Sequence, residues 1–292
     1  MAPTRPVAEL VDEYIALRRS LGYRSVTRER SLRAFARYLS GHDGPVPLES
    51  TLGWATLTSS TDPHNPARRI AAVRGFLRHL HALDSATDVP APGRLGPTGH
   101  RKPPHIYSDV DVADLMAAAG RLAPAGGLRP LCYHTLFGLL ACTGMRVSEA
   151  LALSCADVDL DTGAVTVQAG KRGLARLVPL HASAVAALGA YASERGRRFG
   201  RPGPGEAFFR TDSSERVSYN DAYGTFSGLR QELSWTAGGR TRAPRVHDLR
   251  HRMVVRRIQA WHAQGADVDA KVASLATYLG HVEVTNGTQS CS

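Results

Sequence analysis

The sequence predicts a mainly α-helical protein with one small antiparallel β-sheet. Most of the chain shows apolar residues at the spacing of an amphipathic helix, whereas residues 157–180 show the alternation and tight turns of a strand meander. The 292 residues, of which 43% are hydrophobic, suffice for about two domains with a core each. We expect a first domain over residues 1–88, a linker over 89–106 and a second domain over 107–292.

The first domain is predicted to be a small bundle of helices. Apolar residues recur at intervals of three and four, as in Leu32, Phe35 and Leu39, which share one inner face. Pro66 suits the first turn of the last helix, because its fixed backbone angle matches a helix start. The four predicted helices cover residues 7–20, 27–39, 48–57 and 66–83.

Helical periodicity disappears between residues 85 and 106. This stretch holds five prolines and three glycines, which is typical of an extended linker. It also carries Arg94, Arg101 and Lys102, with no acidic residue after Asp88. Two interpretations stay open here: a basic segment that follows a long polyanion, or an ordinary solvated linker.

The second domain is predicted to be helical around the meander. Ser108 suits a helix N-cap, with Asp111 placed to complete a capping box. Residues 131–142 are apolar almost all round and end before Gly144, which predicts a central buried helix. Two tight turns separate three short strands. Later helices are predicted over residues 181–195, 219–233, 246–262 and 267–279.

The charge balance favours an anionic partner. The chain has 36 Lys and Arg against 26 Asp and Glu, which gives a net charge of +10. This surplus is compatible with nucleic acid, an acidic membrane or a bound phosphate. Residues 240–257 concentrate it, with seven arginines and two histidines against the single acid Asp248. We interpret this segment as a rigid anion site, with a solvated basic helix as the alternative.

The sequence has no feature of a membrane span or an exported protein. Its most apolar stretch, residues 131–145, is shorter than the roughly 20 residues that a bilayer requires and contains His134. Acidic residues among the first 20 positions exclude the apolar core of a signal peptide. The four cysteines form no C-x-x-C pair, which favours a reducing compartment. We therefore expect a soluble, cytoplasmic protein.

Five residues are candidates for chemistry, although each has an ordinary structural explanation when it is taken alone. Arg146 lies between two helices as a helix-end cation would, and Lys171 lies at a hairpin tip, where a solvated lysine is common. His247 and Arg250 share one helix face, and His281 suits a C-terminal cap. Their combination along the chain is more informative than any one of them.

Four motifs in succession give the chain a family resemblance. They are TGMRVSEAL at residues 143–151, GK at 170–171 with RLVPL at 176–180, HDLRH at 247–251, and LGH at 279–281. On these motifs the chain resembles the tyrosine recombinases, the family of phage integrases and Xer recombinases. The first domain is similar to the core-binding domain of that family. The resemblance implies an N-terminal helical core-binding domain and a C-terminal DNA breaking–rejoining catalytic domain.

The resemblance also implies a metal-free transesterification of DNA. Arg146 and Arg250 would clamp the non-bridging oxygens of the scissile phosphate. Lys171 would protonate the departing 5′ oxygen, His247 would add hydrogen bonding and acid–base help, and His281 would donate a further hydrogen bond. No cofactor and no metal are implied. The implied partners are double-stranded DNA and further copies of the chain that associate on it.

The position of the family's nucleophile differs in this sequence. The resemblance places a tyrosine about nine residues after His281, where this chain has Ser290. A serine hydroxyl is far less acidic than a phenol, whose pKa is about 10, so we do not expect Ser290 to substitute. Tyr278 is interpreted as a packing residue. The ending reads like a premature or shifted frame, and the terminal helix that would strengthen self-association is also missing.

Two functions therefore stay open. In the first, the chain is a site-specific recombinase that clamps the scissile phosphate but forms no covalent 3′-phosphotyrosyl intermediate. In the second, it is a non-catalytic DNA-binding remnant that occupies recombination sites or modulates an intact recombinase. The acids of the motif region, Glu149 or Asp157, are expected to orient an arginine rather than to touch DNA.

A metal helix is a further interpretation of residues 247–251. His247 and His251 flank Asp248 at the spacing of two zinc ligands on one helix face. The metalloprotease motif with this spacing uses Glu in place of Asp, and a catalytic zinc requires a third ligand that the sequence does not place. The four-motif resemblance is therefore preferred, and no metal is expected.

Overall fold

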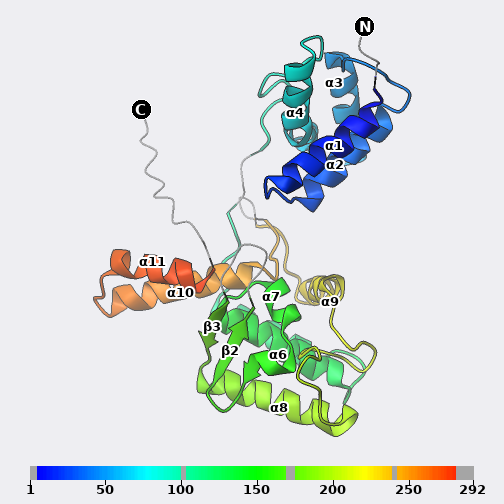
Figure 1. Ribbon diagram of the computed structural model, residues 1–292. Coiled ribbons are helices and arrows are strands. Elements are labelled where there is room, and N and C mark those ends of the chain that lie inside the picture. Colours follow the sequence, from blue (N-terminus) through cyan, green and yellow to red (C-terminus); the bar gives the residue numbers. More distant parts are fainter. Residues whose placement is uncertain (1–4, 100–102, 169–174, 239–241, 281–292) are drawn as a thin grey trace. The chain divides into compact units, whose positions relative to one another are not determined.

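The computed structural model divides the chain into two compact units, Met1–Arg101 and Lys102–Ser292 (Figure 1). It describes residues 5–99, 103–168, 175–238 and 242–280. In these ranges helices dominate both units, and three strands form an antiparallel sheet. The predicted fold class, mainly helical with a small antiparallel sheet, is confirmed.

The first unit is the predicted helical bundle. Phe35 and Trp54 pack edge to face at its centre, with ring centroids 5.0 Å apart, and Phe76 is fully buried beside them. The guanidinium of Arg69 covers the Trp54 ring at 4.1 Å from its centroid. Every helix lies within one residue of its predicted range. The helices are α1 (Val7–Ser20), α2 (Val26–Tyr38), α3 (Leu48–Thr56) and α4 (Asn65–Leu83).

Residues 87–99, which we call the strap, pack against α4 instead of extending away from it. Arg74 Nε donates to the carbonyl oxygen of Pro90 at 3.1 Å, and Arg68 Nε donates to that of Thr98 at 2.8 Å. Leu95 adds apolar contact with the bundle core. The strap therefore returns along α4 from its C-terminal to its N-terminal end. For residues 89–99 this corrects the prediction of an extended linker, because α4 supplies side-chain donors to the carbonyl groups of the strap.

The second unit is built around α6. Leu136 and Phe137 of this helix are fully buried, and Phe137 meets Phe226 edge to face at 5.9 Å. The predicted capping box is present, since the Ser108 hydroxyl accepts from the Asp111 amide at 3.0 Å. The elements are α5 (Asp109–Gly120), α6 (Leu128–Thr143), α7 (Val147–Ala152), a 3-10 turn η1 (Cys155–Asp157), α8 (Ala182–Phe199), α9 (Tyr219–Glu232), α10 (Asp248–Ala263) and α11 (Val268–Tyr278).

The sheet confirms the predicted meander. It consists of β1 (Val158–Asp159), β2 (Ala164–Val167) and β3 (Arg176–Pro179), paired antiparallel in the order β1-β2-β3. Val165 faces Val178 across β2 and β3, and both side chains are buried in the core around α6. The second predicted turn, at residues 170–173, lies outside the described residues.

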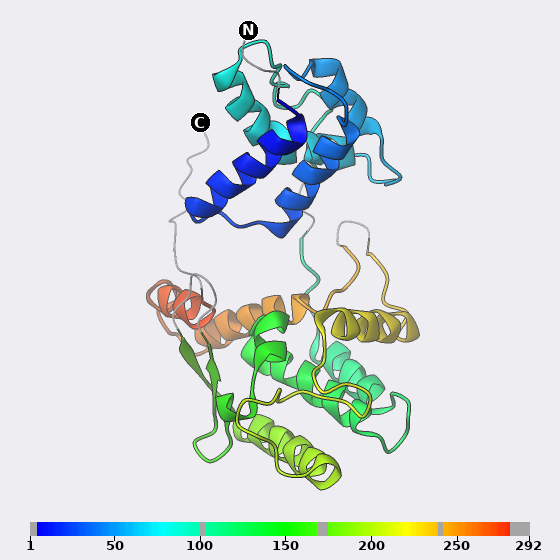
Figure 2. The same cartoon turned by 45° about the vertical axis from the view of Figure 1, so that its right-hand side comes forward.

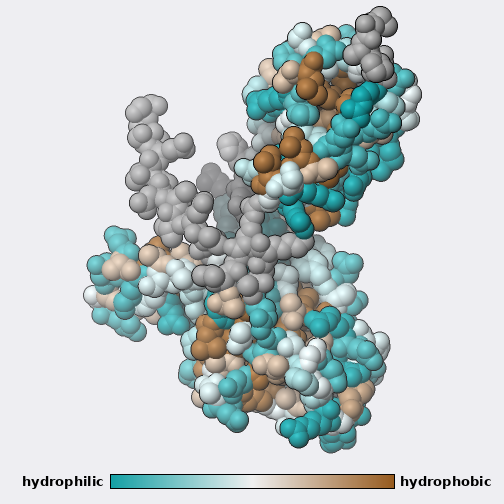
Figure 3. Space-filling view, viewed as in Figure 1, coloured by the Kyte–Doolittle hydropathy of each residue, from teal (hydrophilic) through white to brown (hydrophobic). Residues whose placement is uncertain are grey.

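Helices α10 and α11 lie side by side as a hairpin, as both views show (Figures 1 and 2). Met253, Leu275 and Leu279 form a small apolar cluster within it. The face drawn in Figure 3 is largely hydrophilic, with apolar areas on both units. Among the described residues, no helix combines the length and the apolar character needed to cross a bilayer. Three free cysteines occur in the same ranges, namely Cys132, Cys142 and Cys155.

Candidate functional site

Gly144 is the C-cap of α6 and lies two residues before Arg146. Its φ of +66° is the left-handed conformation that glycine adopts without strain, and its N–H donates to the carbonyl of Leu140 at 3.0 Å. A β-carbon at this position would lie 2.3 Å from Cε of Met253 in α10. The end of α6 and α10 are thus in close contact, and Arg146 follows at the N-cap of α7.

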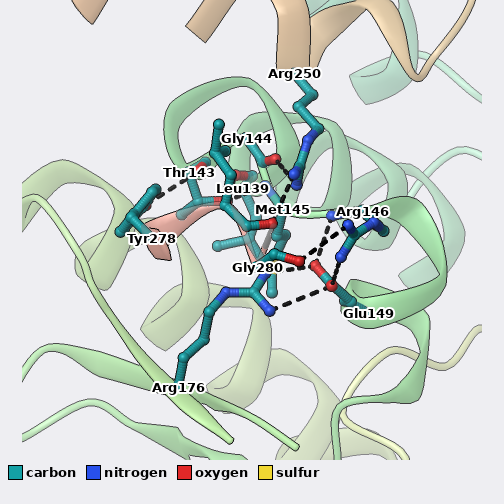
Figure 4. A network of polar contacts seen from close by, with 11 residues as sticks. Leu139, Thr143, Gly144, Met145, Arg146, Glu149, Arg176, Arg250, Tyr278 and Gly280 are labelled. Atoms are coloured by element: carbon teal, nitrogen blue, oxygen red, sulfur yellow. Dashed lines mark hydrogen bonds and ion pairs between the residues drawn. The ribbon is translucent and has the colours of Figure 1, made fainter. Parts of the chain in front are cut away.

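The carboxylate of Glu149 holds two arginines that come from different elements (Figure 4). Arg146 Nη1 donates to Oε1 at 2.7 Å, and Arg176 Nη2 of β3 donates to Oε2 at 2.7 Å. Arg176 Nη1 adds a longer bond to Oε1 at 3.3 Å. The backbone N–H of Arg146 also donates to Oε2 at 2.8 Å, which satisfies an amide at the start of α7. Glu149 therefore makes the contact with an arginine that its position in the motif suggests.

Arg250 projects from the first turn of α10 into the interior and is 6% exposed. Its Nη1 donates to the carbonyl oxygen of Gly144 at 2.8 Å, and its Nη2 donates to that of Leu279 at 2.6 Å. Burial lowers the pKa of Arg250 to about 10, and the positive charge of Arg146 acts in the same direction. Within the described residues no carboxylate forms an ion pair with Arg250, so its direct partners are the two carbonyl oxygens, while Glu149 acts on its charge from a distance.

Gly280 follows α11 and lies close to the guanidinium groups of Arg146 and Arg176. Its φ is +72°, and a β-carbon would lie 3.0 Å from Nη1 of Arg176 and 3.4 Å from Nη1 of Arg146. Arg146 Nη2 donates to the Gly280 carbonyl over a long 3.4 Å. Only a residue without a side chain leaves both guanidinium groups in place.

The site carries more positive than negative charge. Although burial alone would raise the pKa of Glu149, hydrogen bonds from Arg176 and Arg146 outweigh it and hold the pKa below its ordinary value. Glu149 is therefore ionised at neutral pH, and three guanidinium groups, including that of Arg250, face this one carboxylate. Planar guanidinium forks match the geometry of phosphate oxygens. The arrangement suits an oxyanion with several oxygens.

His247 lies at the N-cap of α10, one turn before His251, and the two rings meet edge to face at 5.6 Å. Partial desolvation of the ring lowers the pKa of His247, and His251, Arg250 and Arg245 add to the effect. The ring is therefore neutral at pH 7, with one nitrogen able to donate and the other able to accept a hydrogen bond.

Asp248 is fully buried and faces arginines rather than histidines. Its Oδ1 accepts from Arg242 Nη2 at 3.0 Å, and its Oδ2 accepts from the backbone N–H of Arg245 at 3.0 Å. Because this carboxylate is occupied by two residues of the preceding loop, it does not complete a metal site with His247 and His251. No group of three possible metal ligands occurs in the part of the chain that the structure describes.

The basic segment 240–257 is more neutralised than its composition suggests. Asp248 pairs with Arg242 and Arg245, while Asp109 at the start of α5 pairs with Arg252 and with Arg256, the latter at 3.1 Å. The interpretation of the whole segment as one anion site is thus corrected, because four of its arginines are in ion pairs. Of its described arginines, Arg250 is the one that points into the site.

The structure brings together three of the five predicted site residues. Arg146 and Arg250 donate to the neighbouring carbonyl groups of Gly280 and Leu279, and His247 lies at the N-cap of α10, within one turn of Arg250. Lys171 and His281 lie outside the described residues, as does Ser290.

Three further residues of the motif region, Asp157, Tyr278 and Arg176, have clear partners in the structure. Asp157 does not orient an arginine but accepts from Ser154 at the η1 turn, at 2.6 Å from its hydroxyl. Tyr278 packs against the core, and its hydroxyl donates to the Thr143 carbonyl at 3.0 Å. Arg176 was not singled out, although it stands in the RLVPL motif. The signal that could have found it is a charged residue at the start of an otherwise apolar strand.

The fold and the site define a helical domain in which a cluster of arginines lies beside a three-stranded sheet. A sequence profile described as the phage integrase family matches residues 109–286. The chain belongs to this family, which is that of the tyrosine recombinases.

Relatives match over most of this chain. A protein named as an integrase/recombinase, y4rB of Sinorhizobium fredii, is 34% identical over 282 residues, which cover 95% of this chain and 90% of that protein. The tyrosine recombinase XerD of Mycobacterium tuberculosis is 31% identical over 229 residues, which cover 78% of this chain and 69% of that protein.

Two solved structures share the fold. A lambda integrase tetramer bound to a Holliday junction superimposes with a TM-score of 0.64 at 16% identity, over 95% of this chain and 78% of that chain. The Tn1549 transposon integrase in complex with circular intermediate DNA gives a TM-score of 0.64 at 15% identity, over 96% of this chain and 92% of that chain.

Proposed function

We propose that this chain acts in site-specific DNA recombination by binding double-stranded DNA and holding one backbone phosphate between Arg146 and Arg250. The observation that carries the proposal is the buried Arg250 guanidinium, which has no carboxylate partner in the described ranges and stands beside a second arginine. The Arg146 side chain is 39% exposed and so remains accessible to a ligand. The lambda and Tn1549 integrases, bound to DNA in their solved structures, support DNA as the partner.

The chemistry that we propose is transesterification without a metal. Two guanidinium groups stabilise the charge that spreads over the non-bridging oxygens in the transition state. Lys171 supplies the proton for the departing 5′ oxygen, and neutral His247 offers a hydrogen bond and acid–base help. His281 donates a further hydrogen bond to the phosphate. Several copies of the chain assemble on DNA, as the lambda integrase tetramer on its junction suggests.

The nucleophile distinguishes two versions of this function. Ser290 stands where the family has tyrosine, and Tyr278 is a poor substitute because burial raises its pKa and its hydroxyl is bonded to Thr143. We propose that the 292-residue chain binds and clamps DNA without forming a phosphotyrosyl bond. This favours a second candidate function, in which the chain occupies recombination sites or modulates an intact recombinase.

DNA binding is tested by its salt dependence. For the full chain and a duplex of about 30 base pairs, we expect log affinity to fall by about 0.9 per unit of log salt for each neutralised phosphate. Arg250→Gln and Arg146→Gln should each weaken binding and reduce this slope. Arg197→Gln is the matched control, because Arg197 is exposed on α8 and pairs with Glu194. We call the proposed pair of Arg146 and Arg250 around one phosphate the phosphate clamp. An affinity that changes neither with salt nor with either substitution would refute it.

Cleavage is tested separately with a nicked suicide substrate that carries a recombination site. We expect no covalent protein–DNA adduct on a denaturing gel for the 292-residue chain. An adduct would show that the chain has a functional nucleophile and would remove the non-catalytic alternative. Binding without an adduct supports the site-occupying function.

A further inference from the structure

We propose that Arg176 is a positioning residue of the phosphate clamp, which it serves through Glu149 without touching the phosphate. The inference deepens the proposed function and rests on it. Both terminal nitrogens of Arg176 donate to Glu149, at 2.7 and 3.3 Å. Its side chain is 16% exposed, against 39% for Arg146. Arg176 is therefore directed at the carboxylate and is less accessible than Arg146.

The reason for this arrangement is competition for Arg146. Glu149 lies beside the clamp, and an isolated carboxylate would form a bidentate fork with Arg146, using the same face that a phosphate needs. In the structure Arg146 gives Glu149 only Nη1, whereas its Nη2 makes a long 3.4 Å bond to the Gly280 carbonyl. Arg176 takes part of the charge of Glu149 and occupies both of its oxygens. Arg146 keeps a donor that is weakly engaged.

The position of Arg176 in the sheet adds a mechanical role. Arg176 begins β3 and pairs with Val167 of β2, so its side chain is carried by the sheet and not by a loop. Through Glu149 it joins this sheet to the start of α7, and Gly280, two residues after the end of α11, lies against its guanidinium. Two of the four motifs thus meet at the carboxylate of Glu149, and Gly280 of a third motif contacts Arg146 beside it (Figure 4).

The test is a double-mutant cycle on the full chain, with Arg176→Met, Glu149→Gln and their combination. The probe is a mixed-sequence duplex of about 30 base pairs, followed by fluorescence anisotropy. We expect Arg176→Met to weaken binding by about 10- to 150-fold, the range for a charge-assisted hydrogen bond at the clamp. In the Glu149→Gln background the same change should cost less than about twofold, because no carboxylate remains to capture Arg146. Arg197→Gln should leave affinity unchanged.

The variant Arg176→Lys distinguishes a positioning role of Arg176 from a purely structural one. Lysine keeps the charge, so we expect it to recover part of the affinity that Arg176→Met loses, but not all of it because it has only one nitrogen to give Glu149. A purely structural role would lower the thermal unfolding midpoint of Arg176→Met with no dependence on Glu149. If Arg176→Met does not fold, the cycle is run with Arg176→Lys, whose smaller loss should likewise vanish in the Glu149→Gln background.

The outcomes distinguish this inference from the proposed function. Equal losses in both backgrounds would mean that Arg176 contacts DNA itself, which overturns the positioning role. No effect of Arg176→Met, together with a loss for Arg250→Gln, would also overturn it and leave the phosphate clamp standing. No effect of Arg250→Gln would instead refute the clamp.

Discussion

Nη1 of Arg250 and the carbonyl oxygen of Gly144 lie 2.8 Å apart, so that a side chain from α10 is hydrogen-bonded to the C-cap residue of α6. These residues belong to two motifs that are separated by about a hundred positions in the sequence. The bond means that the placement of the buried guanidinium depends on the backbone conformation at Gly144. Perturbation of this glycine should therefore change both stability and DNA binding.

Gly144→Ala should destabilise the protein by about 1–2 kcal/mol, because an L-residue is strained at φ +66°. Contact with the flexible Met253 side chain adds a smaller cost. Gly144→Asn should cost less, since asparagine enters the left-handed region more easily. Urea unfolding of the two variants gives the comparison. Equal stability of the alanine variant and the parent would contradict the argument.

Asp248→Asn should destabilise the second unit by about 1–3 kcal/mol. The substitution removes the charge from a fully buried group that accepts from Arg242 and from the Arg245 backbone. Asp109→Asn is the matched control, because Asp109 also pairs with two arginines but is largely exposed, and it should cost less than about 1 kcal/mol. Similar losses in chemical denaturation would show that burial does not set the difference.

The pH dependence of stability should report on His247. Its pKa in the folded protein is depressed, so the unfolded chain takes up a proton first as the pH falls below about 7. The stabilising contribution of the neutral ring is present above this range and is lost toward pH 5. His247→Gln should flatten that part of the profile, measured as the thermal unfolding midpoint from pH 8 to pH 5. An unchanged slope would exclude His247 as its source.

The strap should be released by removing its two arginine donors on α4. Arg68→Ala combined with Arg74→Ala deletes three hydrogen bonds to strap carbonyl groups, each with a net value of about 0.5–1.5 kcal/mol. We expect faster tryptic cleavage after Arg94, while α4 stays protected. Arg78→Ala, an exposed change on the same helix, should leave the rate unchanged. Cleavage at the parent rate in the double variant would show that the remaining contacts of the strap, those with His64 and His81 and the apolar contact of Leu95, suffice to hold it.

The long helices were predictable because each buries one regular stripe of apolar residues. The ranges of α1 and α4 follow directly from such stripes, and Gly144 marks the end of α6 as expected. The range of helix α7 does not follow from the sequence, since six residues are too few for a period to be visible. The packing of the strap was also missed, because its bonds go from α4 side chains to backbone carbonyl groups and leave no pattern in the composition.

The candidate site was predictable only in part. Arg146 and Arg250 could be chosen from motifs, yet the sequence contains nothing that pairs Glu149 with Arg176 across α7 and β3. The charge of residues 240–257 overestimates the anion-binding capacity of this segment for a related reason. Its main partner outside the segment, Asp109, is more than a hundred positions away, so counting neighbours overstates the free charge.

The strap determines where a fragment of this protein should be divided. Because α4 is about 28 Å long and the strap retraces it, the polypeptide leaves the first unit near the start of that helix. A fragment that ends at residue 88 would strip Leu95 from the bundle core and deprive Arg74 of its carbonyl partners. An independently folding N-terminal module should therefore extend to residue 99, and its solubility and cooperativity should be judged on that longer piece.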